Sequence, residues 1–293
     1  MDEGENAFGL RRLVVEPSVF AGVGTWALEP SHAHYVRDVL RLRVGAELEV
    51  VDGEGRTGRA IIASIDRHGM RLEVSEVTRA PAPRGPRLRL IQGLGKGDKM
   101  DQVVRQATEL GVWRISPVIT ERAVARGARA ERWRTIADDA VRVSGRAFRP
   151  TIDPVVALGA VLAGSERRAA VSLCLAGNAP LGLRAFFGRG RRPTEARAAA
   201  GAAVGTGGGA GVGAGVGVGV GVGAGIEVGG SEEDLQTIEV LVGPEGGLSL
   251  GELRAAEVAG FTAVHLGPNI LRTETAGPAA VAMIMLLAGG LDG

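Results

Sequence analysis

From Leu88 onward the sequence alternates between short apolar runs and longer segments with helical periodicity. The apolar runs have the length and composition of buried strands and lie at 88–94, 112–119, 171–175, 238–242 and 264–266. The helical patterns lie at 98–110, 132–148, 249–260 and 276–288. Alternation of this kind is typical of a mostly parallel sheet covered by helices. The sequence therefore predicts an α/β fold for this part of the chain.

Residues 10–78 follow another pattern, in which short β-prone runs are separated by turn signals. The runs lie at 13–15, 48–51, 58–65 and 70–77. One helical turn is expected over 32–40, with Ser31 as its N-cap. Several short strands in about 70 residues are typical of a small barrel. The Pro-rich stretch that follows gives the predicted organisation: a β-barrel domain over 1–80, a linker over 81–86 and an α/β domain over 87–293.

Residues 198–226 contain only Gly, Ala, Val, Thr and Ile and carry no charge. The length of this tract would allow a membrane span. Fifteen of residues 201–230 are glycine, however, which makes a poor helix with little apolar surface. We therefore expect a flexible low-complexity insertion at about 195–230, with a weak Gly-Val edge strand as an alternative.

Composition excludes several classes of protein. A single cysteine, Cys174, rules out a disulfide framework and a cysteine-based zinc cluster, and its apolar strand makes it a core residue. His32 and His34 are expected on a surface helix edge, so no metal site is predicted. No apolar run follows the first residues, so we expect no signal peptide and a cytoplasmic protein.

The net charge of +1 hides a basic central block. Residues 79–150 contain 16 basic and 7 acidic side chains, whereas the segments on either side are acidic. Such a block favours an anionic partner such as RNA, although a solvated helix face is the alternative. The basic side chains expected to contact RNA lie beside the predicted helical turn and at strand and helix ends: Arg37, Arg41, Arg43, Lys96, Lys99, Arg122 and Arg126.

Two glycine-containing loops each follow a predicted strand and precede a predicted helix. The first is LVGPEGGLS at 241–249, and the second is LGPNILRTETA at 266–276. Glycines at the carboxyl end of a strand let a ligand approach main-chain groups, although an ordinary tight turn is the alternative. A third segment, GLGKGDKM at 93–100, could bind phosphate but does not match a Walker A loop, so an NTPase is not expected.

In this order and spacing, the segments resemble the RsmE family of bacterial methyltransferases, which modify N3 of a uridine in small-subunit ribosomal RNA. Further matches are HYVRDVLRLRVGAELEVVDGEG at 34–55, KGDKMDQVVRQATELGVWRISPVITERA at 96–123 and RWRTIADDAVRVSGRAFRP at 132–150. The resemblance covers nearly the whole chain except the glycine tract. It implies an N-terminal PUA-like β-barrel for RNA and a C-terminal SPOUT α/β domain with a deep trefoil knot. It also implies S-adenosylmethionine as cofactor and a homodimer.

The resemblance also implies the site residues. Those expected to bind the cofactor lie in the two loops: Gly243, Pro244, Glu245, Gly246, Gly247, Leu266, Gly267, Ile270, Leu271, Thr273, Thr275 and Ala276. Thr120, Glu121 and Arg122 are expected to line the site. We expect Arg272 and Glu274 to be catalytic: Arg272 could stabilise charge on the uracil, while Glu274 could orient Arg272 or accept the proton.

Some positions depart from the family pattern. Asn269 stands where arginine is usual, Arg142 and Val143 stand where Glu-Gln is usual, and Gln106 stands where lysine is usual. These departures affect expected RNA contacts and local helix packing, and they leave the cofactor loops unchanged. Two other functions stay open from the sequence: a non-catalytic RNA-binding protein, and a SPOUT methyltransferase that acts on another RNA or another atom.

Overall fold

The computed structural model describes residues 11–20, 24–66, 69–83, 85–123, 130–163, 171–188 and 237–290. The expected insertion at about 195–230 and Arg126 lie outside the described residues. The chain divides into two compact units. The first comprises Met1–Pro83, Met100–Ile115 and Gly127–Asp153, and the second comprises Arg84–Lys99, Ser116–Arg126 and Pro154–Gly293.

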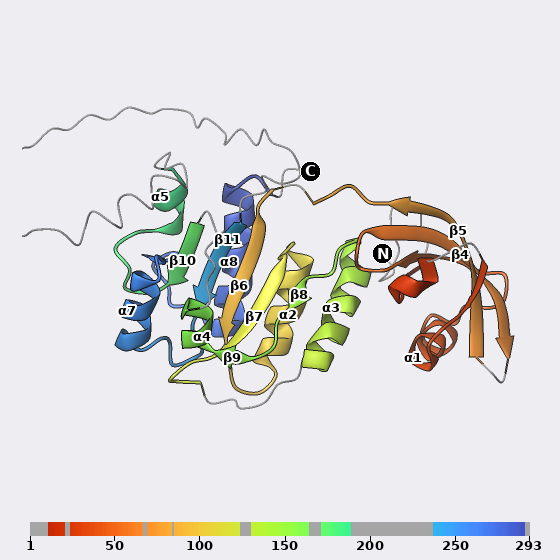
Figure 1. Cartoon of the computed structure of the whole chain (residues 1–293), viewed down its shortest axis with the longest axis horizontal. Coiled ribbons are helices and arrows are strands. Elements are labelled where there is room, and N and C mark those ends of the chain that lie inside the picture. Colours follow the sequence, from red (N-terminus) through yellow and green to blue (C-terminus); the bar gives the residue numbers. More distant parts are fainter. Residues whose placement is uncertain are drawn as a thin grey trace, which may run out of the picture. The chain divides into compact units, whose positions relative to one another are not determined.

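The first unit contains a five-stranded sheet (Figure 1). Its strands are β1 (Arg11–Val14), β2 (Gly24–Ala27), β3 (Glu47–Val51), β4 (Arg56–Asp66) and β5 (Gly69–Arg79). The strand order is β1-β3-β4-β5-β2, in which β1 pairs parallel to β3 and the remaining pairs are antiparallel. Buried and exposed residues alternate along β4 and β5, so that Ile62 and Leu72 enter the core of this unit.

Short helices join the first strands of this sheet. They are η1 (Pro17–Phe20), α1 (Pro30–His34) and the π-helical turn η2 (Tyr35–Val39). The expectation of helix near 32–40 is confirmed, but Ser31 as its N-cap is wrong, because the N-cap is Glu29. Pro30 occupies the first helical turn, where its fixed φ suits the helix and its missing N–H leaves no donor to satisfy.

Two helices complete the first unit, and side chains join them to each other and to the sheet. They are α2 (Lys99–Glu109) and α3 (Ala130–Ser144). Asp101 on α2 is buried and accepts hydrogen bonds from Arg132 Nε at 2.7 Å and Trp133 Nε1 at 3.0 Å on α3. Val141 on α3 packs with Val14 of β1 and Val51 of β3. These contacts fix α3 on the sheet.

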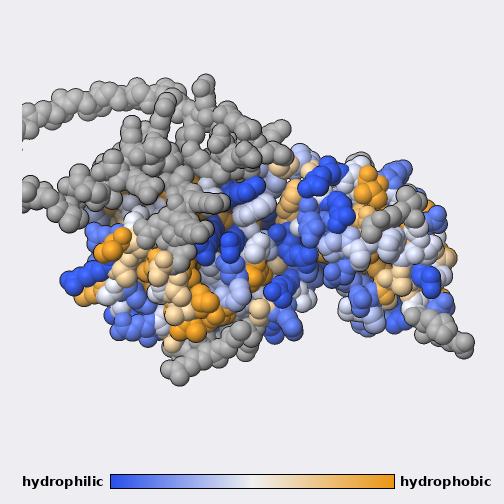
Figure 2. Space-filling model, in the orientation of Figure 1, coloured by the Kyte–Doolittle hydropathy of each residue, from blue (hydrophilic) through white to orange (hydrophobic). Residues whose placement is uncertain are grey.

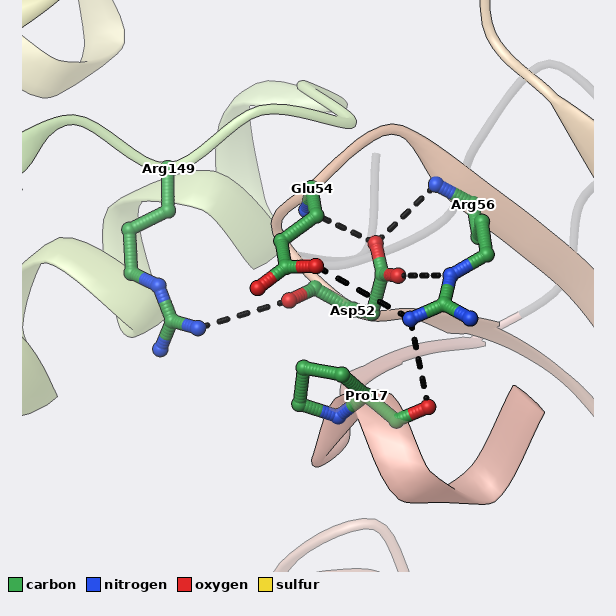
Figure 3. A network of polar contacts seen from close by, with 5 residues as sticks. All are labelled: Pro17, Asp52, Glu54, Arg56 and Arg149. Carbon is green, nitrogen blue, oxygen red and sulfur yellow. Dashed lines mark hydrogen bonds and ion pairs between the residues drawn. The ribbon is translucent and has the colours of Figure 1, made fainter. Parts of the chain in front are cut away.

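A buried carboxylate organises the turn between β3 and β4 (Figure 3). Asp52 accepts the N–H groups of Glu54 and Arg56 and the Nε of Arg56, at 2.5 to 2.9 Å. Arg149, which follows α3, donates to the backbone oxygen of Asp52 at 3.4 Å and to the carboxylate of Asp138 at 2.8 Å. The arginine therefore joins the turn to α3.

The second unit is built on parallel strands. They are β6 (Arg87–Gly93), β7 (Arg114–Ile119), β9 (Val156–Ala157), β10 (Val171–Leu175), β11 (Thr237–Val242) and β12 (Thr262–Val264). The sheet order is β12-β10-β11-β6-β7-β8, and β9 also pairs with β7; Arg114 and Ile115 of β7, which pair with β8 (Thr151–Ile152), belong with β8 to the first unit. The pairs of β10 with β11 and β12, and of β11 with β6, are parallel. The predicted α/β fold with a parallel sheet is confirmed.

Helices cover this sheet on both faces (Figure 1). They are α4 (Leu158–Ala163), α5 (Leu183–Gly188), α7 (Leu250–Val258) and α8 (Thr273–Leu287). Leu158, Leu162 and Phe261 pack on Ile91 and Leu241 on one face, and α8 contacts β6 and β11 on the other. Among the described helices, none has the length and apolar character that a membrane span needs. On the face seen in Figure 2, hydrophilic and apolar side chains are interspersed.

Candidate functional site

The carboxyl ends of neighbouring parallel strands gather the glycine-containing loops of the second unit. The segment 94–98 follows β6, and the loop 243–249 follows β11, which pairs with β6 over its whole length. The loop 265–272 follows β12 and leads into α8. Ligands of parallel α/β sheets bind at this edge. The structure thus brings together three of the segments that the sequence singled out.

Glycines in this region permit close approaches of the backbone. A Cβ at Gly93 would lie 2.7 Å from the nitrogen and Cδ of Pro244, and a Cβ at Gly243 would lie 3.0 Å from the carbonyl carbon of Gly247. Gly247 has a φ of +67°, which favours glycine, and its N–H donates to the oxygen of Pro244 at 2.8 Å. The loop is therefore a tight turn whose main chain is accessible.

A capping box fixes the end of this loop. Ser249 Oγ accepts the N–H of Glu252, and Glu252 accepts the N–H of Ser249 in return. The other oxygen of Glu252 accepts the N–H of Glu121, at 2.8 Å. Arg122 Nη1 donates to the oxygen of Gly246, also at 2.8 Å. Glu121 and Arg122, which follow β7, are thereby joined to the loop and to α7.

A neutral hydrogen-bond chain connects the core to the start of α8. Gln92 at the end of β6 donates through Nε2 to Thr273 Oγ1 at 2.9 Å, and Thr273 Oγ1 donates to the oxygen of Gly243 at 2.8 Å. Gln92 is 1% exposed, and its Oε1 has no partner among the described residues. Our sequence reasoning missed Gln92. The sequence does carry a signal for it, because the amide of Gln92 directly follows the apolar pair Leu90 and Ile91 at the end of the strand.

A charged cluster lies beside this chain. Lys99 Nζ lies 2.9 Å from Glu245 Oε1 and 3.5 Å from Glu274 Oε2, and Glu245 Oε1 also accepts the N–H of Lys96 at 2.8 Å. The hydrogen bond with Glu245 raises the pKa of Lys99. Burial alone would raise the pKa of Glu245, but the hydrogen bonds from Lys99 and the Lys96 N–H hold it below its usual value. This ion pair is charged at neutral pH.

The two residues expected to be catalytic have different surroundings. Arg272 is the N-cap residue of α8 and is exposed, with no ion-pair partner for its side chain among the described residues. Glu274, whose side chain is only 15% exposed, pairs with Lys99. The structure gives no Arg272–Glu274 ion pair within the described part of the chain. That Glu274 orients Arg272 stays a prediction without a contact to support it.

The second loop presents main-chain donors and apolar side chains. Within the part of the chain that the structure describes, the N–H groups of residues 266, 267 and 269–271 donate to no other backbone group. Ile270 is 93% exposed and Leu271 is 38% exposed. A Cβ at Gly177, which follows β10, would touch Ile270 Cγ1 at 4.0 Å. Unpaired amides beside exposed apolar groups suit a ligand with a polar and an apolar part.

One cavity of about 600 Å³ lies beside α5 and is lined by Gly182, Arg184, Ala185, Gly188 and His265, the first residue of the 265–272 loop. It contains none of the residues of the 243–249 loop. Within the described residues, no group of three or more His, Cys, Asp and Glu side chains lies together as a metal site would require. The candidate site therefore rests on the loops and not on a deep pocket.

Some of the residues expected to contact RNA are bound to other groups of the protein, and others are exposed. Arg37 makes a two-pronged contact with Asp38, at 2.8 to 3.2 Å, and Lys99 and Arg122 are engaged as described. Arg41, Arg43 and the side chain of Lys96 are exposed. Arg126 lies outside the described residues. Contact of any of these residues with RNA stays a prediction.

Comparison with known proteins gives the class first. A family model described as RNA methyltransferase domain matches residues 83–208 and 226–285, and one described as RNA methyltransferase PUA domain matches residues 28–75. The first model covers more than half of the chain, so the protein is an RNA methyltransferase by family. Its particular family follows from a Mycobacterium bovis protein named ribosomal RNA small subunit methyltransferase E, which is 30% identical over 90% of this chain and 86% of its own. The chain belongs to the family of that methyltransferase, and the resemblance is confirmed.

Two solved structures of methyltransferases are similar to this chain along most of its length. A Neisseria gonorrhoeae structure described as ribosomal RNA small subunit methyltransferase E bound to S-adenosyl methionine is 27% identical, with a TM-score of 0.70 over 94% of this chain and 97% of its own. A Legionella pneumophila structure described as a putative methyltransferase is 21% identical, with a TM-score of 0.72 over 94% and 96% of the two chains, and supports the fold.

Proposed function

We propose that this chain transfers a methyl group from S-adenosylmethionine to N3 of a uridine in small-subunit ribosomal RNA. One observation carries the proposal: in a member of this methyltransferase family, the loops after β6, β11 and β12 meet the N-terminus of α8 at the carboxyl edge of a parallel sheet. The gonococcal relative bound to S-adenosyl methionine supports this choice of cofactor.

The residues present fit this cofactor. The N–H groups of residues 266, 267 and 269–271, which donate to no other backbone group among the described residues, can bind an adenine edge, and the exposed Ile270 and Leu271 can cover its ring. The 243–247 loop offers main-chain groups at glycines, where side chains do not block their approach. When bound, S-adenosylmethionine supplies a methyl group on a positively charged sulfur.

The chain's own residues would aim and activate the uracil. N3 carries a proton that must leave for its lone pair to attack the methyl carbon. Arg272 is exposed at the N-cap of α8, where its guanidinium can stabilise negative charge on the uracil carbonyl oxygens. Arginine stays protonated at ordinary pH and cannot take the proton. Glu274, one residue into the helix, is the proposed acceptor.

The organisation inherited from the resemblance belongs to the same proposal. Residues 1–80 would form a PUA-like barrel that binds RNA, and residues 87–293 a SPOUT domain whose chain is knotted. Two copies would form a homodimer, and a ribosomal RNA substrate would make the protein cytoplasmic. The exposed Arg41, Arg43 and Lys96 would contact phosphates.

Mapping of methylated nucleotides tests the proposed reaction. Small-subunit ribosomal RNA from a strain that lacks the gene should lose one N3-methyluridine, and the purified protein with S-adenosylmethionine should restore it. Restoration of a methyl group at another atom would identify a related methyltransferase. Binding of the RNA without any methyl transfer would identify a non-catalytic RNA-binding protein and would overturn the proposal.

A further inference from the structure

Three segments far apart in the sequence approach one another around Gly95. A Cβ at this glycine would lie 3.2 Å from Glu245 Oε1, 3.3 Å from Lys99 Cβ and 3.4 Å from Thr273 Cγ2. The segment after β6, the 243–247 loop and the start of α8 therefore meet here. Two of these three carry residues that we assign to the cofactor.

Lys99 is the side chain that bonds to both of the other segments. Its ammonium lies 2.9 Å from Glu245 of the 243–247 loop and 3.5 Å from Glu274 of α8. The side chains of Lys99, Glu245 and Glu274 are 29%, 32% and 15% exposed. Water screens pairs of such partial burial less than it screens pairs on an open surface.

The charge balance shows what Lys99 does. The carboxylates of Glu245 and Glu274 face the ammonium of Lys99, and Glu245 also accepts the backbone N–H of Lys96. Without the ammonium, Glu245 and Glu274 would repel each other across the gap that Lys99 now fills. Loss of Lys99 would therefore push the 243–247 loop and the start of α8 apart, beyond the loss of one favourable contact.

We propose that Lys99 is a positioning residue for the cofactor, which holds the 243–247 loop and the N-terminus of α8 at their working separation, and that it is not a phosphate ligand. The proposal rests on the proposed function, because these two segments are the ones assigned to S-adenosylmethionine. It replaces our expectation from the sequence that Lys99 contacts RNA.

Lys96 provides the contrast. It stands three residues earlier in the same glycine-containing segment, and among the described residues its side chain has no ion-pair partner. Only its backbone N–H contacts Glu245, and that group survives any change of the side chain. The side chain of Lys96 is therefore free to contact a phosphate, while that of Lys99 is engaged.

The test compares Lys99→Met with Lys96→Met in two measurements. Titration calorimetry with S-adenosylhomocysteine, the demethylated product, should show about tenfold weaker binding by Lys99→Met, a change of about 1.4 kcal/mol, and little change for Lys96→Met. Binding of a small-subunit ribosomal RNA fragment at several salt concentrations should show the reverse. Lys96→Met should lower the salt slope by about one, and Lys99→Met should leave it unchanged.

Kinetics separate positioning from a general loss of structure. Lys99→Met should raise the KM for S-adenosylmethionine about tenfold, a loss that saturating cofactor overcomes, whereas any fall in kcat measures the effect on Glu274, the second partner of Lys99. Lys99→Arg, which keeps the positive charge, should recover most of the affinity. Arg254→Met, which removes an exposed cation from α7, is the control for net charge and should change neither measurement.

Three outcomes would overturn the role of Lys99. They are normal cofactor affinity in Lys99→Met, a salt slope lowered by one in that variant, and no recovery in Lys99→Arg. If Lys99→Met unfolds, Lys99→Gln, which keeps a hydrogen-bond donor but removes the charge, takes its place, and normal affinity in it would equally overturn the role. A wild-type chain that binds no cofactor would instead overturn the proposed function itself.

Discussion

At the scale of single residues, Arg272 and Glu274 are both proposed to act on the uracil, but their surroundings differ. Arg272 is exposed at the N-cap of α8, whereas Glu274 is mostly buried beside Lys99. A charged side chain in solvent can move to meet a substrate, and one held by an ion pair is fixed in place. We therefore expect Arg272→Lys, which conserves the charge, and Glu274→Gln, which conserves the shape, to change the kinetics in different ways.

Arg272→Lys keeps the charge and loses the planar fork of the guanidinium. If Arg272 stabilises the uracil oxygens, kcat should fall about a hundredfold while cofactor affinity is kept. Glu274→Gln should shift the pH–rate profile if Glu274 accepts the N3 proton. Single-turnover methylation across pH measures both effects, and an unchanged rate at saturating cofactor would remove both residues from the chemistry.

Gly93 tests the close approach at the end of β6. Gly93→Ala places a methyl group 2.7 Å from Pro244, against backbone that has no flexible side chain to give way. We expect a loss of about 1–3 kcal/mol in the free energy of unfolding, with weaker cofactor binding. Gly159→Ala in α4 is the matched control, because nothing lies within 4 Å of the added Cβ, and it should be neutral or stabilising. Equal stability of the two variants in urea unfolding would contradict the packing argument.

At the scale of elements, local signals predicted some features and missed others. The helix expected over 249–260 is confirmed as α7, and the capping box of Ser249 and Glu252 at its start is a local signal because both partners lie within four residues. Neither β8 nor the π-helical turn η2 was predicted, since two-residue strands and π-turns depend on their neighbours in space. The partners of Lys99 were equally hidden, because Glu245 and Glu274 lie far along the chain.

The contact of Arg149 with Asp138 on α3 predicts a dependence of stability on pH. Burial raises the pKa of Asp138 from 3.8 to about 6, against the hydrogen bonds from Arg149 that lower it. A carboxyl whose pKa is higher in the folded state stabilises the fold most at low pH, and this contribution is lost as pH rises through about 6. Asp138→Asn removes the titrating group without changing its shape.

Thermal unfolding of Asp138→Asn and wild type should therefore differ most near pH 7.5. There the asparagine variant should gain of order 1 kcal/mol relative to wild type, and the gap should close toward about pH 4, near the unfolded pKa of 3.8. Asp139→Asn, whose side chain is 63% exposed in wild type, is the control and should show no such trend. A gap that widens on acidification would mean that the ion pair with Arg149 outweighs burial.

At the scale of the whole molecule, the class of fold was predictable and the grouping of its parts was not. Alternating strands and helices predicted the parallel sheet, because that pattern is local. The chain divides so that Met100–Ile115 and Gly127–Asp153 belong with the N-terminal sheet. Contacts such as Val141 with Val14, and Arg149 with Asp52, underlie this division and leave no trace in periodicity. The domain boundary at 81–86 stays a prediction.

The glycine-rich tract gives a prediction about the whole chain. Residues 198–226 contain no charge and no aromatic side chain, and they lie between α5 and β11 outside the described residues. Replacement of this tract by a short Gly/Ser linker should leave thermal stability and methylation unchanged, since its composition offers no charged, aromatic or periodic apolar face for packing. A large fall in either measurement would mean that the tract packs or binds RNA.

The hydrogen bond between Gln92 and Thr273 joins residues that are 181 positions apart. Protein synthesis therefore makes the amide long before the hydroxyl that accepts from it. Lys99 is likewise synthesised before its partner Glu274, and Gly243 before Thr273, which donates to its oxygen. A nascent or prematurely terminated chain that stops short of α8 has the sheet strands but cannot assemble the site. Methyl transfer would thus begin only after translation has passed this helix.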